Sequence, residues 1–127
     1  MIKPALKNKK IVLCDRFKDS TLAYQIAGRQ LDKSLINSLN NLTELNPDLT
    51  LFFDCPIEIG LTRAKNRAKL DRFEDEELSF HERIYNQYHK LYKEHPDRIV
   101  KIEAFKDIHT VHQNTLEVLS QHIKELL

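Results

Sequence analysis

Apolar and polar residues alternate in two different ways along this chain. Three short segments are rich in apolar residues and end in or beside a charged one: residues 11–14, 49–55 and 98–104. The unbroken apolar run over residues 11–14 is typical of a strand that is covered on both faces of a parallel sheet. Between these segments, apolar residues recur every three or four positions, which predicts amphipathic helices.

Residues that start or stop helices set the expected boundaries in the first half of the chain. Ser20 and Thr21 are expected to cap a helix that ends near Gly28. Asp32 is expected to cap the next helix, which runs to residue 42. The apolar stripe of that helix is expected to pack in the core, and it consists of Leu35, Ile36, Leu39 and Leu42.

Four further segments complete the expected order. Residues 1–8 read as the end of a short helix, and Pro56 suits the first turn of a helix with basic residues at its far end. Ser79 opens a long helix, and a final helix covers residues 108–127. Residues 66–77 are dense in charge and poor in apolar side chains, so we expect a mobile, solvated segment that acts as a lid.

This order of strands and helices is that of an α/β fold with a parallel sheet. The chain has 127 residues, of which 41% are hydrophobic, and this suits one domain over residues 1–127. Three strands of the buried type would still leave apolar edges that something else must cover. We therefore expect another part of the protein to cover the edges of this sheet.

Composition argues against several classes of function. Twenty basic against nineteen acidic side chains give a net charge of +1, which provides no broad field for nucleic acid or an acidic membrane. No apolar run approaches the roughly 18–20 residues of a membrane span, and no signal-peptide core is recognisable, so we expect a cytoplasmic protein. Cys14 and Cys55 are expected to be buried thiols rather than a disulfide.

The first candidate site is Asp15 with Arg16, directly after the first expected strand. Ligands of open parallel sheets bind outside the carboxyl ends of the strands. A guanidinium gives paired hydrogen bonds to phosphate, and the acid can orient it or hold a water on Mg²⁺. A structural ion pair at a strand end explains the same two residues equally well from position alone, but the residues that follow favour the phosphate site.

Two weaker candidates lie further along the chain. Arg63, Arg67 and Arg72 could fold over a triphosphate, although a solvated basic helix end is the simpler interpretation. His109 and His112 are three residues apart on an expected helix, but no third ligand stands at matching spacing. An exposed helix face is therefore preferred there to a metal site.

Taken together, four stretches resemble the thymidylate kinase family in the family's order. CDRFKDSTLAYQ with the following AGRQLD is similar to its Asp-Arg-aromatic and Ser-Thr-x-x-Tyr-Gln signature. LTLFFDCPIEIGLTRAKNR resembles its fourth strand and next helix, and LDRFEDEELSFHERIYNQYHKLY resembles its lid and the helix after it. IKPAL resembles the helix end before the Asp-Arg strand. The resemblance covers essentially the whole chain.

The resemblance implies a P-loop-kinase-like, three-layer α/β/α fold that transfers a phosphoryl group from Mg²⁺-ATP to dTMP. Asp15 and Arg16 match the pair near the acceptor phosphate and the metal, with Asp15 acting on the metal through water. The residues that match the run facing thymine and deoxyribose are Ser20, Thr21, Tyr24 and Gln25. Those that match the ATP side and the lid are Arg63, Arg67, Arg72, Ala104, Phe105 and Lys106. Asp15, Arg16 and Arg72 are the expected catalytic residues.

One part of the family pattern has no counterpart here. Gly28 and Gly60 are the only glycines, so no glycine-rich phosphate loop can be formed from this sequence. The chain therefore reads as the C-terminal portion of a thymidylate kinase, truncated at the N-terminus, with a gap beside the Asp-Arg strand. We expect a homodimer or a missing N-terminal segment as partner, and no dTMP kinase activity from the isolated chain.

Two alternatives to this interpretation stay open. The first is a non-catalytic remnant that serves as a binding or oligomerisation module through its long helices. The second is another nucleoside or nucleotide kinase with a related Asp-Arg strand end.

Overall fold

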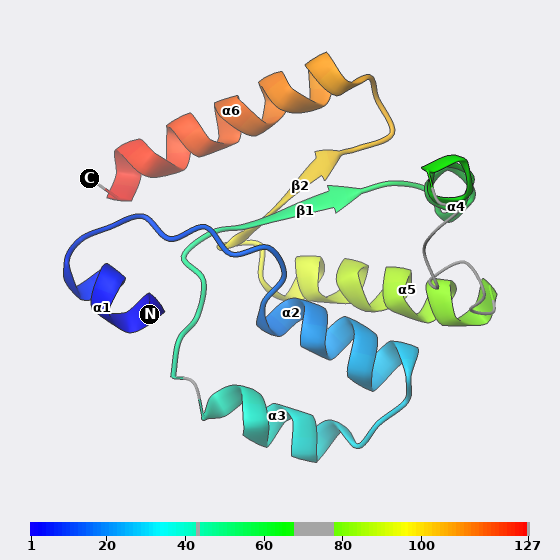
Figure 1. The fold of residues 1–127 in the computed structure, drawn as a ribbon, viewed down its shortest axis with the longest axis horizontal. Helices are drawn as coiled ribbons and strands as arrows, with labels where there is room; N and C mark the ends of the chain where they lie inside the picture. Colours follow the sequence, from blue (N-terminus) through cyan, green and yellow to red (C-terminus); the bar gives the residue numbers. More distant parts are fainter. Residues whose placement is uncertain (43, 68–77, 127) are drawn as a thin grey trace.

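The structure is a computed structural model that describes residues 1–42, 44–67 and 78–126. Its elements follow one another in the order shown in Figure 1: α1 (Ile2–Lys7), α2 (Lys18–Thr21), the π-helix η1 (Leu22–Gly28), α3 (Lys33–Asn41), β1 (Thr50–Asp54), α4 (Ile57–Arg67), α5 (Leu78–Glu94), β2 (Ile99–Glu103) and α6 (Ile108–Leu126). The predicted lid, apart from Asn66 and Arg67 at the end of α4, lies outside the described residues, as does Arg72.

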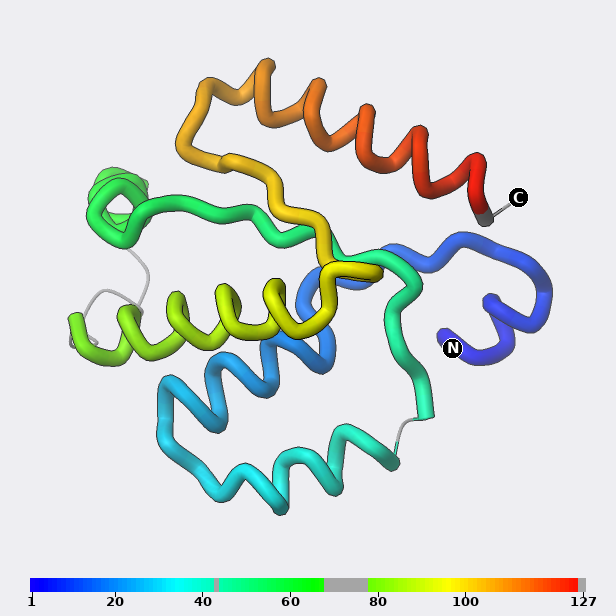
Figure 2. The backbone as a smooth tube through the Cα atoms, turned by 180° about the vertical axis from the view of Figure 1, so that it is seen from behind, coloured from blue at the N-terminus to red at the C-terminus, as the bar shows by residue number. Residues whose placement is uncertain are grey.

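β1 and β2 pair in parallel, with Thr50 opposite Ile99 and Asp54 opposite Glu103. Helix α6 lies along one face of this sheet, and α5 lies along the other with α2 and η1 beyond it, as the two opposite views in Figures 1 and 2 agree. The buried side chains of Ile99 and Ile102 fill the space between the layers. The predicted α/β architecture with a parallel sheet is confirmed, as are the second and third predicted strands.

The prediction of a buried strand over residues 11–14 is wrong. This segment is extended but irregular, and Ile11 and Leu13 are 70% and 88% exposed. A strand needs a neighbour that accepts its backbone hydrogen bonds, and no described residue pairs with the backbone of this segment. Cys14 is consequently exposed rather than buried, whereas Cys55 is half-buried, and both thiols are free.

The tightest packing in the molecule is between η1 and α5. Ala23 is fully buried against Phe80 and Ile84, which are 4% and 7% exposed. Gly28, at the end of η1, comes so close to α5 that a Cβ there would lie 2.9 Å from Phe80 Cε2 and 3.0 Å from Ile84 Cγ1. Arg83 closes this end of η1, because its Nη2 donates to the Gly28 carbonyl at 2.7 Å.

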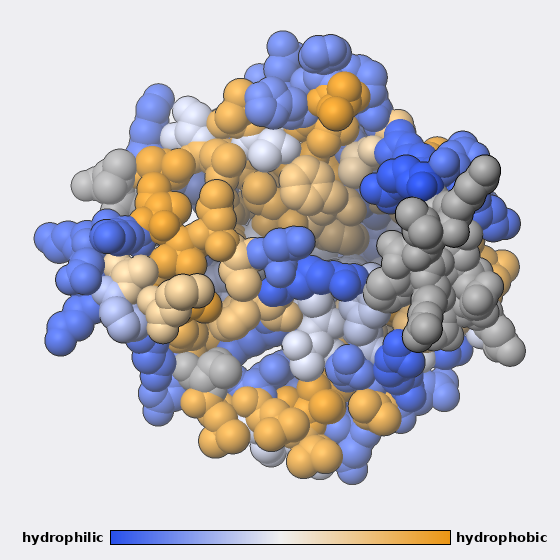
Figure 3. Space-filling view, viewed as in Figure 1, coloured by the Kyte–Doolittle hydropathy of each residue, from blue (hydrophilic) through white to orange (hydrophobic). Residues whose placement is uncertain are grey.

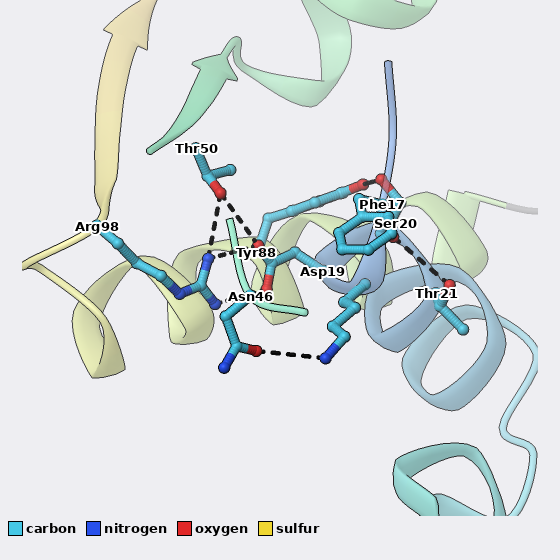
Figure 4. A network of polar contacts seen from close by, with 9 residues as sticks. Phe17, Asp19, Ser20, Thr21, Asn46, Thr50, Tyr88 and Arg98 are labelled. Atoms are coloured by element: carbon cyan, nitrogen blue, oxygen red, sulfur yellow. Dashed lines mark hydrogen bonds and ion pairs between the residues drawn. The ribbon is translucent and has the colours of Figure 1, made fainter. Parts of the chain in front are cut away.

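A buried ion pair ties α2 to the sheet (Figure 4). The Arg98 guanidinium donates to both carboxylate oxygens of Asp19, at 2.8 and 2.9 Å, and also to the Thr50 hydroxyl at 3.1 Å. Asp19 is 8% exposed, and its hydrogen bond to Arg98 raises the pKa of that guanidinium above its usual value. The start of α2 is thus fixed to the point where both strands begin.

Helix starts agree with the sequence at α3 but not at α2. The Asp32 carboxylate accepts from the backbone N–H groups of Ser34 and Leu35, so the predicted cap is confirmed. At α2 the predicted Ser20 and Thr21 caps are wrong, because the helix begins after Phe17 and no side chain caps it. Ser20 and Thr21 lie inside the helical segment instead.

The apolar stripe of α3 does not pack in the core as expected. Ile36 is buried, but Leu35, Leu39 and Leu42 are 59%, 53% and 77% exposed. Orange side chains accordingly cover the lower edge of the space-filling view in Figure 3, where Figure 1 places α3. The remaining predicted helices are confirmed, and none of the described helices is long and apolar enough to cross a membrane.

The two glycines give a matched test of the η1–α5 contact. Gly28→Ala should destabilise the chain by about 1–3 kcal/mol, because the added methyl overpacks a core formed by ring and aliphatic carbons. Gly60→Ala, in α4, meets no atom within 4 Å and should be stabilising by up to about 1 kcal/mol through helix propensity. Urea unfolding of both variants measures the difference, and a neutral Gly28→Ala would contradict the packing described.

Candidate nucleotide site

A hollow of about 500 Å³ opens over α2 and the first turn of η1. Five predicted site residues border it, namely Arg16, Ser20, Thr21, Tyr24 and Gln25. Arg29 and Lys18 also line it and add two more basic side chains. The structure therefore gathers the residues expected to bind the acceptor nucleotide around a single concave surface.

Arg16 stands at the mouth of this hollow in an unusual backbone conformation. Its φ is 64°, in the left-handed region that non-glycine residues rarely adopt. Its guanidinium lies over the Tyr24 ring, 4.3 Å from the centroid, which leaves the edge of the guanidinium free to donate hydrogen bonds. Strained backbone of this kind concentrates at functional sites, where surrounding contacts hold it in place.

Aromatic side chains beneath the hollow hold Tyr24 and Ser20. Tyr24 meets Phe80 and Tyr88 edge-on, each at 6.4 Å between ring centroids. The hydroxyls of Ser20 and Tyr88 share a hydrogen bond of 2.9 Å, and Tyr88 stacks on Phe52 of β1 at 5.5 Å. This stack connects the floor of the hollow to the sheet.

Asp15 and Arg16 also border a second, larger cavity. This cavity has a volume of about 820 Å³ and lies between residues 12–17, β1, α4 and α5. Asp15 lines only the larger cavity, whereas Arg16 and Ser20 line both. Among the described residues no group of three His, Cys, Asp or Glu side chains is placed to hold a metal ion, so Asp15 could act on a metal only with water or ligand oxygens completing the shell.

The residues predicted for the ATP side form a second group at the other end of the sheet. Arg63 of α4 donates to the carbonyls of Ala104 and Phe105, at 2.6 and 2.9 Å. Lys106, in the same turn, pairs with Glu103 at 2.7 Å. The turn after β2 and the α4 helix are thus brought together, while Arg67 projects from the exposed end of α4.

Two charged groups near the site were not predicted from the sequence. One is the Asp19–Arg98 pair below Ser20. The other lies at the end of β1, where the Asp54 carboxylate is 3.0 Å from His89 Nε2 and 3.8 Å from Lys101 Nζ. An acid at the end of the second apolar run was visible in the sequence, but its partners come from α5 and β2, and sequence spacing alone does not indicate such contacts.

Comparison with known proteins decides the family. The family model described as thymidylate kinase matches residues 1–115. This chain belongs to the thymidylate kinase family. It is 41% identical to the thymidylate kinase of Trichormus variabilis over 129 aligned positions, and 43% identical to that of Legionella pneumophila. These alignments cover 99% and 100% of this chain but only 61% and 60% of the two relatives.

The fold agrees with the family. The crystal structure of thymidylate kinase from Ehrlichia chaffeensis superposes with a TM-score of 0.69 at 36% identity, over 94% of this chain and 55% of that one. The expected P-loop-kinase-like α/β architecture is therefore confirmed. This chain spans about three fifths of the length of the curated relatives it matches.

The pKa of Tyr88 gives a test of the aromatic floor. Burial raises the pKa of this phenol above 10.0, against a smaller lowering by the hydrogen bond to Ser20. The folded state then binds the phenolic proton more tightly than the unfolded state. The resulting contribution to the free energy of unfolding is complete below pH 10 and is lost as the pH rises through the raised pKa of the folded state.

In an alkaline titration followed by tyrosinate absorbance, one of the four tyrosines should ionise late in the native chain, and Tyr88→Phe should abolish that step. The variant should also lose less stability above pH 10 than the parent. Retention of the late step in Tyr88→Phe would assign it to another tyrosine and contradict the burial described.

Proposed function

We propose that this chain carries the acceptor-nucleotide part of a dTMP kinase, which transfers a phosphoryl group from ATP to dTMP and forms dTDP. The observation that carries the proposal is the 500 Å³ hollow, in which five residues matching the family signature converge from one short stretch, residues 16–25. Family membership supports the reaction class. The volume suits a mononucleotide, since pockets for small molecules begin at about 300 Å³.

The lining supplies the chemistry that dTMP needs. Arg16 can give a phosphate paired, charge-assisted hydrogen bonds, with Lys18 and Arg29 adding positive charge nearby. The Tyr24 ring offers an apolar face, and the remaining lining side chains offer polar groups to a base and a sugar: Ser20, Thr21 and Gln25. We propose that Arg16 holds the acceptor phosphate in line for transfer, which is the main demand of phosphoryl transfer.

The ATP side is proposed on the second group of residues. Arg63 and the turn of Ala104, Phe105 and Lys106 would border the nucleotide, with Arg67 and Arg72 near its phosphates. Mg²⁺ neutralises phosphate charge when it is bound. Because Mg²⁺ usually keeps several water ligands in proteins, a single exposed carboxylate such as Asp15 could serve it through those waters. Asp15 would orient those waters from the edge shared with Arg16.

The described residues do not include a cradle for the ATP phosphates. That cradle is built from backbone N–H groups of a glycine-rich loop and a lysine, whereas Gly28 and Gly60 both lie in helices. We propose that the 127 residues alone bind dTMP but do not turn it over. Purified chain with Mg²⁺, ATP and dTMP should give no dTDP above a blank by chromatography, and dTDP formation proportional to chain concentration would contradict this.

Measurements of dTMP binding distinguish the proposed acceptor site from the proposed ATP side. At about 100 times its Kd, dTMP should stabilise the chain by about 2.7 kcal/mol and raise the melting temperature by on the order of 10 °C. Arg16→Ala should weaken dTMP binding about 10- to 100-fold, since it removes charged hydrogen bonds. Arg63→Ala is the matched control and should leave dTMP binding unchanged.

The same melting experiment decides between nucleotides. A larger shift with a purine monophosphate or a nucleoside than with dTMP would favour another nucleoside or nucleotide kinase. An equal loss of dTMP binding in both arginine variants would show that the hollow over η1 is not the acceptor site.

A second candidate function is that of an oligomerisation module, and the exposed stripe on α3 favours it. Leu35, Leu39 and Leu42 present an apolar row that a second copy of the chain could cover in a homodimer. Sedimentation equilibrium should then show a dimer that Leu39→Lys dissociates, with Lys33→Glu in the same helix as a control for charge. A monomer at all concentrations would remove this candidate.

A further inference from the structure

Arg98 holds the carboxylate of Asp19 by both of its oxygens. Its Nη1 and Nη2 donate to Oδ2 and Oδ1 at 2.8 and 2.9 Å, and Nη1 also donates to the Thr50 hydroxyl at 3.1 Å (Figure 4). The side chains of Arg98 and Asp19 are 19% and 11% exposed. Paired hydrogen bonds between charged groups are among the strongest that a guanidinium makes. The charge of Asp19 is thus neutralised by a residue 79 positions away in the chain.

Asp19 lies close to the proposed acceptor site. It precedes Ser20, whose hydroxyl shares a hydrogen bond of 2.9 Å with Tyr88. Burial is the main cause of the raised pKa of Tyr88, and two opposite charges also act on this phenol: Asp19 raises its pKa and Arg16 lowers it. The Asp19 carboxylate and the Arg16 guanidinium are therefore both within electrostatic range of the same hydroxyl.

Arg16 must keep its guanidinium available in order to bind a phosphate. It stands three residues before Asp19, and its guanidinium lies over the Tyr24 ring at 4.3 Å from the centroid. A cation–π contact at a partly exposed site is weaker than a charge-assisted hydrogen bond to a carboxylate. A carboxylate without its own partner at position 19 would therefore compete with the ring, and with a phosphate, for this guanidinium.

We propose that Arg98 is a positioning residue for the acceptor phosphate: it occupies both carboxylate oxygens of Asp19 and so keeps this acid from competing with the phosphate for Arg16. The same pairing neutralises a negative charge that would repel the phosphate. Arg98 does this without touching the nucleotide, since it lines neither the hollow over η1 nor the larger cavity. The inference rests on the proposed function in one respect, because it takes Arg16 as the group that binds the phosphate.

A purely structural role is the alternative explanation of the pair. Removal of one partner from a buried ion pair destabilises a protein in any case, so a lower melting temperature does not distinguish the two roles. Dependence on the phosphate does, because thymidine has the base and sugar of dTMP and lacks only the phosphate. Positioning of Arg16 affects the binding of dTMP alone, whereas a general disturbance of the hollow affects both ligands.

The test compares dTMP with thymidine in NMR titrations of the 127-residue chain and of Arg98→Met, whose folding is checked by circular dichroism. Arg98→Met leaves the Asp19 carboxylate without its partner. The Kd for dTMP should then rise at least about tenfold, as expected for lost charge-assisted hydrogen bonds, and the Kd for thymidine should change less than about twofold. An equal rise in both Kd values, or no rise for dTMP, would overturn the proposal.

A second substitution at the other end of the pair gives a rescue experiment. Asp19→Asn in the Arg98→Met chain removes the competing charge, so the Kd for dTMP should return to within about threefold of the parent value. A structural role predicts no recovery, because the double variant lacks the ion pair too, and absence of recovery would refute the positioning role. Glu103→Gln breaks the more exposed pair with Lys106 on the same sheet and should leave both Kd values unchanged.

Arg98→Lys provides a milder variant if Arg98→Met does not fold. Lysine keeps the charge but cannot form paired hydrogen bonds with both carboxylate oxygens. In the ligand-free chain the Nε–H resonance of Arg16 should shift in Arg98→Lys and return when Asp19→Asn is added. An Arg16 resonance that Arg98→Lys leaves unchanged would contradict the proposal. Failure of the parent chain to bind dTMP would contradict the proposed function instead, and the resonance would still show whether Arg98 keeps Asp19 from Arg16.

Discussion

The contact between η1 and α5 at Gly28 fixes the side chains of the proposed acceptor site. A larger residue at this position would push the π-helix away from Phe80 and Ile84. Tyr24 lies in the same helix, where it meets Phe80 edge-on and supports the Arg16 guanidinium. The close approach at Gly28 therefore supports the packing on which the Tyr24–Arg16 contact rests.

The sheet connects the proposed acceptor site to the residues proposed for the ATP side. Asp19 and Arg98 join the start of α2 to the start of β2, and the Arg63 hydrogen bonds join α4 to the turn that follows β2. The two groups of proposed nucleotide-binding residues are therefore attached to the same pair of strands. Under the proposed function, this shared pair of strands would hold the two nucleotides in a defined relation.

The sequence predicted correctly those features that depend mainly on residues close together in the chain. The cap at Asp32 and the strand over residues 49–55 depend on nearby residues and were confirmed. A strand over residues 11–14 and burial of the α3 stripe both need a packing partner, and the described residues provide neither. Composition alone could not reveal this. The acceptor-site residues within 16–25 were predicted from the resemblance, and their binding role stays a prediction. Arg98 was missed because it acts through a contact distant in sequence.

The central claim is that the hollow over η1 binds dTMP. Backbone amide chemical shifts of the 127-residue chain, followed by NMR as dTMP is added, test it most directly. We predict saturable shifts concentrated in residues 16–25, with little change in α4 or in residues 104–106. Shifts concentrated in α4 and in residues 104–106, or no saturable shifts at all, would contradict the account.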